Sequence, residues 1–203
     1  MKPAYWDKAQ IELSSRDPIL KKIINKFKDE HLVASKNPFF TIINSIVGQQ
    51  ISTYAARSIK AKLDKLTKIK PETILSVREE ELKLCGLSRM KINYLLGIAE
   101  GVVCGKINFK DLDKLSDEKV KERLIEIKGI GPWTAEMFLI SYLARPNILP
   151  KSDIGIINSI IKLYGEKNKQ SINFDKFFKK WHPWNTVASW YLWRNIDDGD
   201  VTY

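Results

Sequence analysis

The chain of 203 residues contains few of the side chains that bind metals, with two cysteines and two histidines in total. Cys85 and Cys104 cannot provide a four-cysteine iron–sulfur cluster, and their spacing does not match a zinc-binding pattern. His31 and His182 show no partner spacing typical of metal or triad chemistry. We therefore expect two reduced thiols and no metal or cofactor in the chemistry, while a metal bound by backbone carbonyls as an aid to DNA docking stays open.

Long apolar runs and strand-like alternation are also missing. No apolar stretch is long enough to span a bilayer, and the N-terminal segment MKPAYWDKAQ lacks the apolar centre of a signal peptide. No segment alternates with a period of two for long enough to indicate a sheet. These absences argue against a membrane-spanning segment, and no membrane partner is expected. The missing strand pattern predicts an all-α fold.

Basic residues, by contrast, are abundant. Lysine and arginine number 34 against 24 acidic residues, which gives a formal net charge of +10. The excess is spread along the chain, so a basic face is expected, and it favours a polyanionic partner or an anionic membrane surface. The tail from Asp197 to Tyr203 is acidic and is predicted to be solvated.

Helix signals recur along the whole sequence. Apolar residues repeat at helical spacing after Asp17-Pro18, Pro38, Ser88 and Ser116, which are typical helix starts. A short helix is predicted from Pro71, and further helices are predicted beyond Asp153, with Gly165 ending the first of them, and around Phe174–Trp181 and Trp184–Tyr191.

The segment from Lys128 to Asp153 is the most informative. Gly129-Ile130-Gly131 predicts a tight turn, Pro132 suits the first position of a helix, and that helix is expected to run to Ala144. The turn's N–H groups and the positive end of the helix can face one anion, such as a nucleic-acid phosphate. By itself, a G-x-G of this kind also fits a plain turn between helices.

Five segments together resemble a known family. They are VGQQIS (47–52), GLSRMK (86–91), IKGIGPWTAEMFL (127–139), LPKSDIGI (149–156) and WHPWNTVASWYLWR (181–194). In this order they resemble motifs of the HhH-GPD superfamily of base-excision DNA glycosylases, named after its helix-hairpin-helix. The resemblance covers nearly the whole chain and is closest to the alkylbase branch, 3-methyladenine DNA glycosylase II.

This resemblance implies a single glycosylase unit, 1–203, with two helical lobes and an active site in the cleft between them. One lobe would span about 37–145 and end with the hairpin 128–131. The other would combine about 1–36 with 146–203. Asp153 would lie just after the chain crosses between the lobes.

Asp153 matches the family's catalytic aspartate. A carboxylate beside the sugar would stabilise the positive charge that develops as the glycosidic bond breaks, and would direct the attacking water. Many relatives have two adjacent acids here, whereas this chain has Ser152-Asp153. From the residues alone, Ser152 or Asp153 is simply a cap for the following helix.

The resemblance also predicts a base pocket formed by Trp133, Met137, Trp184 and Trp193. Indole faces would attract a cationic alkylated purine, and Met137 stands where many relatives have tyrosine. Trp133 occupies the position of the lysine that forms a Schiff base in lyase-active relatives, so strand cleavage is not expected. For aromatic residues at helical spacing, core packing is the alternative.

The DNA contacts implied by the resemblance come from three segments. Gln50 would fill the gap left by an extruded base, although a solvent-exposed pair of amides fits the sequence equally. Phosphate contacts near the start of a helix likewise compete with ordinary solvated charges. The predicted DNA-binding set is Gly129, Ile130, Gly131 and Thr134 of the hairpin, Gln49 and Gln50, and Ser88, Arg89 and Lys91.

The expected function is that of a monofunctional DNA glycosylase. It would flip out and hydrolyse alkylated purines, 3-methyladenine and also 7-methylguanine, from double-stranded DNA containing damaged bases. We expect a monomer in the bacterial cytoplasm with the nucleoid, or in a nucleus. Two alternatives stay open: a glycosylase of the same fold for deaminated or oxidised bases, and a non-enzymatic DNA-binding module.

Overall fold

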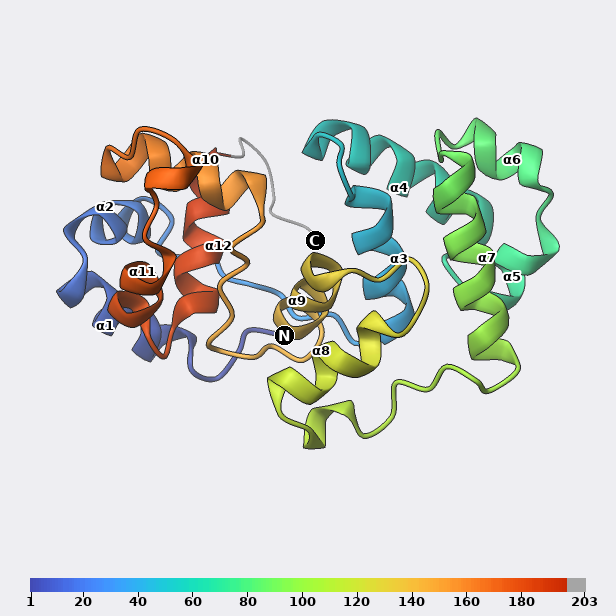
Figure 1. Cartoon of the computed structure of the whole chain (residues 1–203), viewed down its shortest axis with the longest axis horizontal. Coiled ribbons are helices and arrows are strands. Elements are labelled where there is room, and N and C mark those ends of the chain that lie inside the picture. The colour runs from blue at the N-terminus through green and yellow to red at the C-terminus, as the bar shows by residue number, and fades with distance from the viewer. Residues whose placement is uncertain (197–203) are drawn as a thin grey trace. The chain divides into compact units, whose positions relative to one another are not determined.

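The computed structural model describes residues 1–196, so the predicted solvated tail lies outside the described residues. Within that range every regular element is helical, and the prediction of an all-α fold is confirmed (Figure 1). The α-helices are α1 (Trp6–Arg16), α2 (Pro18–Lys26), α3 (Pro38–Gly48), α4 (Thr53–Thr67), α5 (Pro71–Ser76), α6 (Glu79–Leu84), α7 (Arg89–Val103), α8 (Asp117–Ile125), α9 (Pro132–Ser141), α10 (Ile154–Tyr164), α11 (Phe174–Trp181) and α12 (Asn185–Ile196). Two short 3₁₀ helices, Leu112–Lys114 and Lys169–Ser171, lie between them. None of the helices in residues 1–196 has the length and apolar character that a membrane span requires.

Local capping chemistry sets most of the helix starts. The Asp17 carboxylate accepts hydrogen bonds from the N–H groups of Ile19 and Leu20, at 3.0 and 3.2 Å, and Pro18 begins α2. The Ser88 hydroxyl similarly accepts from the Lys91 N–H at 3.3 Å and starts α7. Such caps satisfy N–H groups that a helix leaves open at its N-terminus, which is why short-range sequence signals locate them.

The C-terminus of α9 differs from the prediction. The helix ends at Ser141, three residues before Ala144, whose φ of 50° is in the left-handed region. The N–H of Arg145 then returns to the carbonyl of Leu139 at 2.9 Å. A left-handed residue closes the last turn of the helix here without glycine, so no glycine marks the end in the sequence.

The chain divides into two compact units. Among the described residues, the first combines Met1–Ser35 with 139–196, and the second is Lys36–Phe138, so the boundary falls within α9. In the first unit α12 packs against α1, α2, α10 and α11. Its core is rich in aromatic side chains, as shown by the edge-to-face pair of Trp6 and Trp190, whose ring centroids are 5.3 Å apart.

Asp17 is fully buried in this first unit. Its second carboxylate oxygen accepts hydrogen bonds from the Trp181 indole at 2.9 Å and the Tyr164 hydroxyl at 2.8 Å, and pairs with the Lys180 ammonium at 2.9 Å. Burial raises the pKa of the Asp17 carboxyl, but these hydrogen bonds outweigh burial and hold the pKa below its ordinary value. A residue that the sequence identified as a helix cap therefore also joins α2, α10 and α11.

The second unit is organised around α3 and α7. Helix α3 buries most of its residues, and α7 packs against α3, α5 and α6, while α4 packs against α3. The first residues of α9 complete this unit. As a result, the segments 47–52, 86–91 and 128–134 are parts of one compact unit.

Candidate DNA-binding and catalytic sites

The hairpin between α8 and α9 uses its two glycines differently. Gly129 has a φ of 97°, and a Cβ there would lie 2.5 Å from the ring of Tyr94. Gly131 has no positive φ, and a Cβ there would meet no heavy atom within 4 Å. Gly129 is therefore required by the fold, whereas Gly131 leaves open space beside the start of α9. Ile130 between them is buried.

Gln49 connects the end of α3 to this hairpin. Its amide nitrogen donates to the carbonyl of Gly129 at 3.1 Å and to the hydroxyl of Thr134 at 2.8 Å. Thr134 is itself buried. Two residues predicted to bind DNA, Gln49 and Thr134, thus bind each other and hold two segments together.

Gln50 has the opposite character. Its side chain is exposed, and its φ of 56° is in the left-handed region, which is unusual for a residue with a side chain. The next residue, Ile51, is also exposed, and Ser52 caps α4 by accepting from the Ala55 N–H at 3.2 Å. This geometry presents Gln50 outward on a sharp turn, as its predicted role as a plug requires, and that role stays a prediction.

Lys91 contacts the same turn from α7. The side chain is buried, and its ammonium donates to the carbonyls of Val47 at 2.7 Å and Gln49 at 2.8 Å. Burial lowers the pKa of this ammonium group. Sequence reasoning predicted a phosphate contact for Lys91, whereas the structure directs its ammonium to carbonyl groups of the chain. Ser88 and Arg89, at the start of α7, are exposed and remain predicted phosphate contacts.

Asp153 both caps a helix and binds a distant side chain. One carboxylate oxygen, Oδ1, accepts from the Ile156 N–H at 2.9 Å, which starts α10, and from the indole Nε1 of Trp193 at 2.8 Å. Asp153 is 8% exposed and Trp193 only 1% exposed. The two interpretations of Asp153, cap and functional acid, are therefore compatible, because the oxygen that caps α10 is also bound by the Trp193 indole.

Gly155 is a contributor that sequence reasoning missed. A Cβ at this position would lie 3.0 Å from Asp153 Oδ1 and 3.1 Å from Cδ1 of Trp193. Its backbone conformation is ordinary, so it carries no turn signal in the sequence. A side chain at this position would press against both the carboxylate and the indole.

The predicted base-pocket residues occupy different surroundings. Trp133 is half-buried, and the outer edge of its indole, Cη2, would lie 3.9 Å from a Cβ at Gly48. Met137 is completely buried, as is Trp193. For Trp133 and Met137, core packing and contact with a base both stay open.

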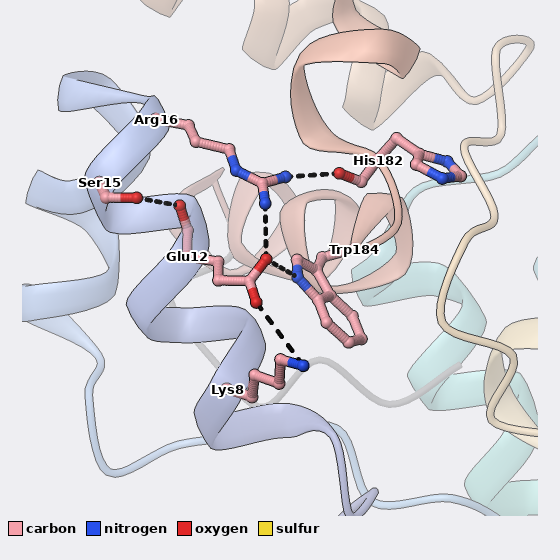
Figure 2. Close-up of polar contacts among 6 residues, drawn as sticks. All are labelled: Lys8, Glu12, Ser15, Arg16, His182 and Trp184. Atoms are coloured by element: carbon pink, nitrogen blue, oxygen red, sulfur yellow. Dashed lines mark hydrogen bonds and ion pairs between the residues drawn. The ribbon is translucent and has the colours of Figure 1, made fainter.

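Trp184 belongs to a polar network at the start of α12. Figure 2 shows its indole N–H directed at the Glu12 carboxylate, 2.9 Å away, on which Arg16 also converges at 2.6 Å. One face of the indole stacks on Tyr5, with centroids 5.7 Å apart, and the Lys8 ammonium lies 6.0 Å from the ring centroid. These contacts hold Trp184 between α1 and α12, and its predicted part in base binding stays a prediction.

Metal-binding side chains do not gather anywhere in the described part of the chain. Within residues 1–196, no group of three or more histidine, cysteine, aspartate or glutamate residues could hold a metal ion. Cys85 and Cys104 are both free thiols, the first buried and the second exposed.

Comparison with known proteins decides the family. Residues 43–183 match the HhH-GPD superfamily of base excision DNA repair proteins. The chain belongs to this family. It is 33% identical to DNA-3-methyladenine glycosylase 1 of Schizosaccharomyces pombe over 204 residues, which cover 96% of this chain and 90% of that protein. The match to the alkylbase DNA glycosidase-like protein mag2 of the same organism is 31% identical, over 95% of each chain.

A solved structure supports the same assignment. The fold matches S. pombe 3-methyladenine DNA glycosylase in complex with abasic DNA with a TM-score of 0.81 and 31% identity, over 97% of this chain and 100% of that chain. The resemblance drawn from the five sequence segments is thereby confirmed, and with it the prediction of a DNA glycosylase of base excision repair. For this HhH-GPD protein, Asp153 and the hairpin are the natural candidates for chemistry and DNA contact.

Trp193 is predicted to act as a positioning residue for Asp153. Trp193→Phe keeps an aromatic ring but removes the donor, so Oδ1 of the carboxylate loses the hydrogen bond from the indole. Hydrogen bonds to charged groups contribute about 1.5–3 kcal/mol, and we expect the rate constant for base release to fall about 10-fold to 100-fold with substrate affinity little changed. Single-turnover kinetics on damaged duplex would measure both quantities.

Trp181→Phe is the matched control, because Trp181 is an equally buried indole that donates to Asp17 instead. It should lower thermal stability and leave the rate of base release unchanged. Equal rates for wild type and Trp193→Phe would contradict the positioning role.

Proposed function

We propose that this protein is a monofunctional DNA glycosylase that flips out alkylated purines from double-stranded DNA and hydrolyses their glycosidic bond. Its substrates would be 3-methyladenine and, second, 7-methylguanine. The observation that carries the proposal is Asp153, a nearly buried carboxylate whose orientation is fixed by Trp193 and by its own helix. The relatives named as 3-methyladenine glycosylases supply the substrate class.

The proposed reaction is a substitution at the sugar carbon that bears the base. The bond from this carbon to the purine nitrogen breaks, and its electron pair leaves with the base. Positive charge then develops on the sugar, and the Asp153 carboxylate stabilises that charge. Water adds to the same carbon and gives up its proton to the carboxylate, which leaves a hydroxyl on the sugar and an abasic site.

The chemistry of an alkylated purine suits a site with a single assigned carboxylate. Methylation at N3 of adenine or N7 of guanine makes the base cationic, so it departs as a neutral molecule once it takes the bond's electron pair. Such a leaving group needs no proton from the protein. A single group that stabilises the sugar cation and accepts a proton from water is then sufficient.

DNA binding is proposed to rest on the hairpin and on net positive charge. The open space beside Gly131 lets a phosphate approach the N–H groups at the start of α9, and this contact does not depend on base sequence. The protein has a formal charge of +10, and its basic side chains would displace counterions from DNA, which increases the affinity. We further propose that the protein acts as a monomer where chromosomal DNA is found, in the bacterial nucleoid or in a nucleus.

Duplex DNA treated with a methylating agent would test the substrate proposal directly. Incubation with the pure protein should free 3-methyladenine, measured by chromatography of the released bases. If the protein frees only a deaminated or an oxidised base from matched duplexes, that base is the substrate in place of alkylated purines. Binding without release from any of these duplexes would show a non-enzymatic DNA-binding module.

Strand cleavage is not expected to accompany base release. The family resemblance puts Trp133 where lyase-active glycosylases carry a lysine, and an indole cannot form a Schiff base with the sugar. The product should therefore be an intact strand with an abasic site, which breaks only after alkali or a separate endonuclease is added. Borohydride added during turnover should trap no protein–DNA adduct, and a covalent adduct would overturn the monofunctional assignment.

A further inference from the structure

The turn that carries Gln50 is anchored to two different parts of its unit. Lys91 holds the turn's backbone carbonyls from α7, and the Gln49 side chain holds the hairpin. We propose that Lys91 and Gln49 form a brace that keeps this turn rigid when its outward side chain enters the DNA stack. This inference rests on the proposed function and assigns Lys91 a positioning role in base extrusion instead of a phosphate contact.

The position of Lys91 supports the brace. Its ammonium approaches the carbonyls of Val47 and Gln49 within 2.8 Å, in the last turn of α3 and just beyond it. Carbonyls at a helix C-terminus lack partners within the helix and carry partial negative charge, so a buried cation binds them strongly. A lysine whose ammonium contacts a DNA phosphate would instead extend into solvent.

Gln49 supplies the second anchor at the same position. Its carbonyl is held by Lys91, while its side chain amide holds Gly129 and Thr134 of the hairpin. Ser52 then fixes the far side of the turn by capping α4. The exposed, left-handed Gln50 therefore lies between neighbours that are fixed on both sides.

Base extrusion requires a rigid turn at this position. Taking a base out of the stack costs free energy, and a side chain that fills the gap is pushed back by the bases trying to restack. If the turn moves, the inserted side chain withdraws and the flipped base returns to the stack. A turn bound to the hairpin is held in place by the element that is proposed to bind the phosphates.

The brace and the phosphate contact make different predictions for Lys91→Met, which removes the charge but keeps much of the side chain's bulk. Without the brace, base release from a paired lesion should fall about 10-fold to 100-fold, because extrusion becomes less favourable. Release from the same lesion in an unpaired bulge should stay within about 3-fold of wild type, since little extrusion is needed there. The dependence of duplex affinity on salt should not change.

Arg89→Met is the matched control, since Arg89 is an exposed cation two residues earlier in the same segment. It should weaken binding to both DNAs alike and lower the salt slope by about one. Gln49→Leu, which breaks only the hairpin anchor, should show the same contrast between paired and bulged lesions as Lys91→Met. This second variant keeps the test valid if Lys91→Met does not fold.

Three outcomes would overturn the brace. In the first, folded Lys91→Met loses as much of its base-release rate on bulged lesions as on paired ones. In the second, the salt dependence of duplex binding by Lys91→Met falls by about one. In the third, both variants release bases from paired lesions at the wild-type rate. Fluorescence of 2-aminopurine next to a flipped abasic nucleotide reports extrusion without catalysis. If the wild type frees no base, the proposed function fails, and this signal still tests the brace.

Discussion

Asp153→Asn should lower the rate of base release about 10²-fold to 10³-fold or more, while affinity for duplex DNA stays the same or rises. The amide is nearly isosteric, and its oxygen can still accept from the Ile156 N–H and the Trp193 indole. Asparagine is also a good helix cap, so the start of α10 should survive. What is lost is the negative charge that stabilises the sugar cation and accepts a proton from water.

Single-turnover release from a methylated duplex and equilibrium binding to an abasic duplex would measure the two effects separately. Asp175→Asn is a suitable control, because Asp175 is an exposed acid of the same unit that pairs with Lys151 at 2.8 Å. It should bind DNA and release bases like the wild type. Release at the wild-type rate by Asp153→Asn would remove Asp153 from the catalytic assignment.

The two hairpin glycines should respond oppositely to substitution. Gly129→Ala should destabilise the fold by about 2–4 kcal/mol, because it combines a φ of 97° with a Cβ only 2.5 Å from the Tyr94 ring. Gly131→Val should fold with nearly wild-type stability, because a Cβ at Gly131 meets open space. It should nevertheless weaken binding to all duplexes alike, since the branched side chain obstructs the phosphate approach.

Chemical denaturation and binding to damaged and undamaged duplexes would separate these effects. In the wild type and in Gly131→Val, affinity should fall steeply with salt, because lysine and arginine contacts release counterions from DNA. A flat salt response would count against an electrostatic contact. If Gly131→Val binds every duplex as tightly as the wild type does, the hairpin turn does not approach the phosphates.

Features that depend on neighbouring residues were predictable from the sequence. The caps at Asp17 and Ser88, the start of α9 at Pro132 and the end of α10 at Gly165 all follow from short-range backbone chemistry. Helix ends without such a marker were placed less well, as at Ser141, and the short helix α6 was not predicted. A six-residue helix offers too few turns for apolar spacing to reveal it.

Partners far apart in the chain were not predictable in this way. Trp193 was predicted as a base-contacting aromatic, and the structure binds its indole to Asp153, 40 residues away. Lys91 was predicted to meet phosphate, and its ammonium binds carbonyls 42 and 44 residues away. Residue type and helical spacing tell that an indole or an ammonium is present, but not which acceptor the fold brings to it.

By itself, the sequence determined the all-helical class, the family, the glycine hairpin and the identity of the candidate acid. The helical class and the hairpin rest on local backbone preferences. The family and the candidate acid rest on the resemblance of five short segments to a known family. Only the tertiary structure decided which hairpin glycine is required for packing, that Gly155 lies against the bonded pair of Asp153 and Trp193, and that Lys91 faces inward. The physical reason is that buried polar groups must find partners, and the partner available depends on packing between segments distant in the chain.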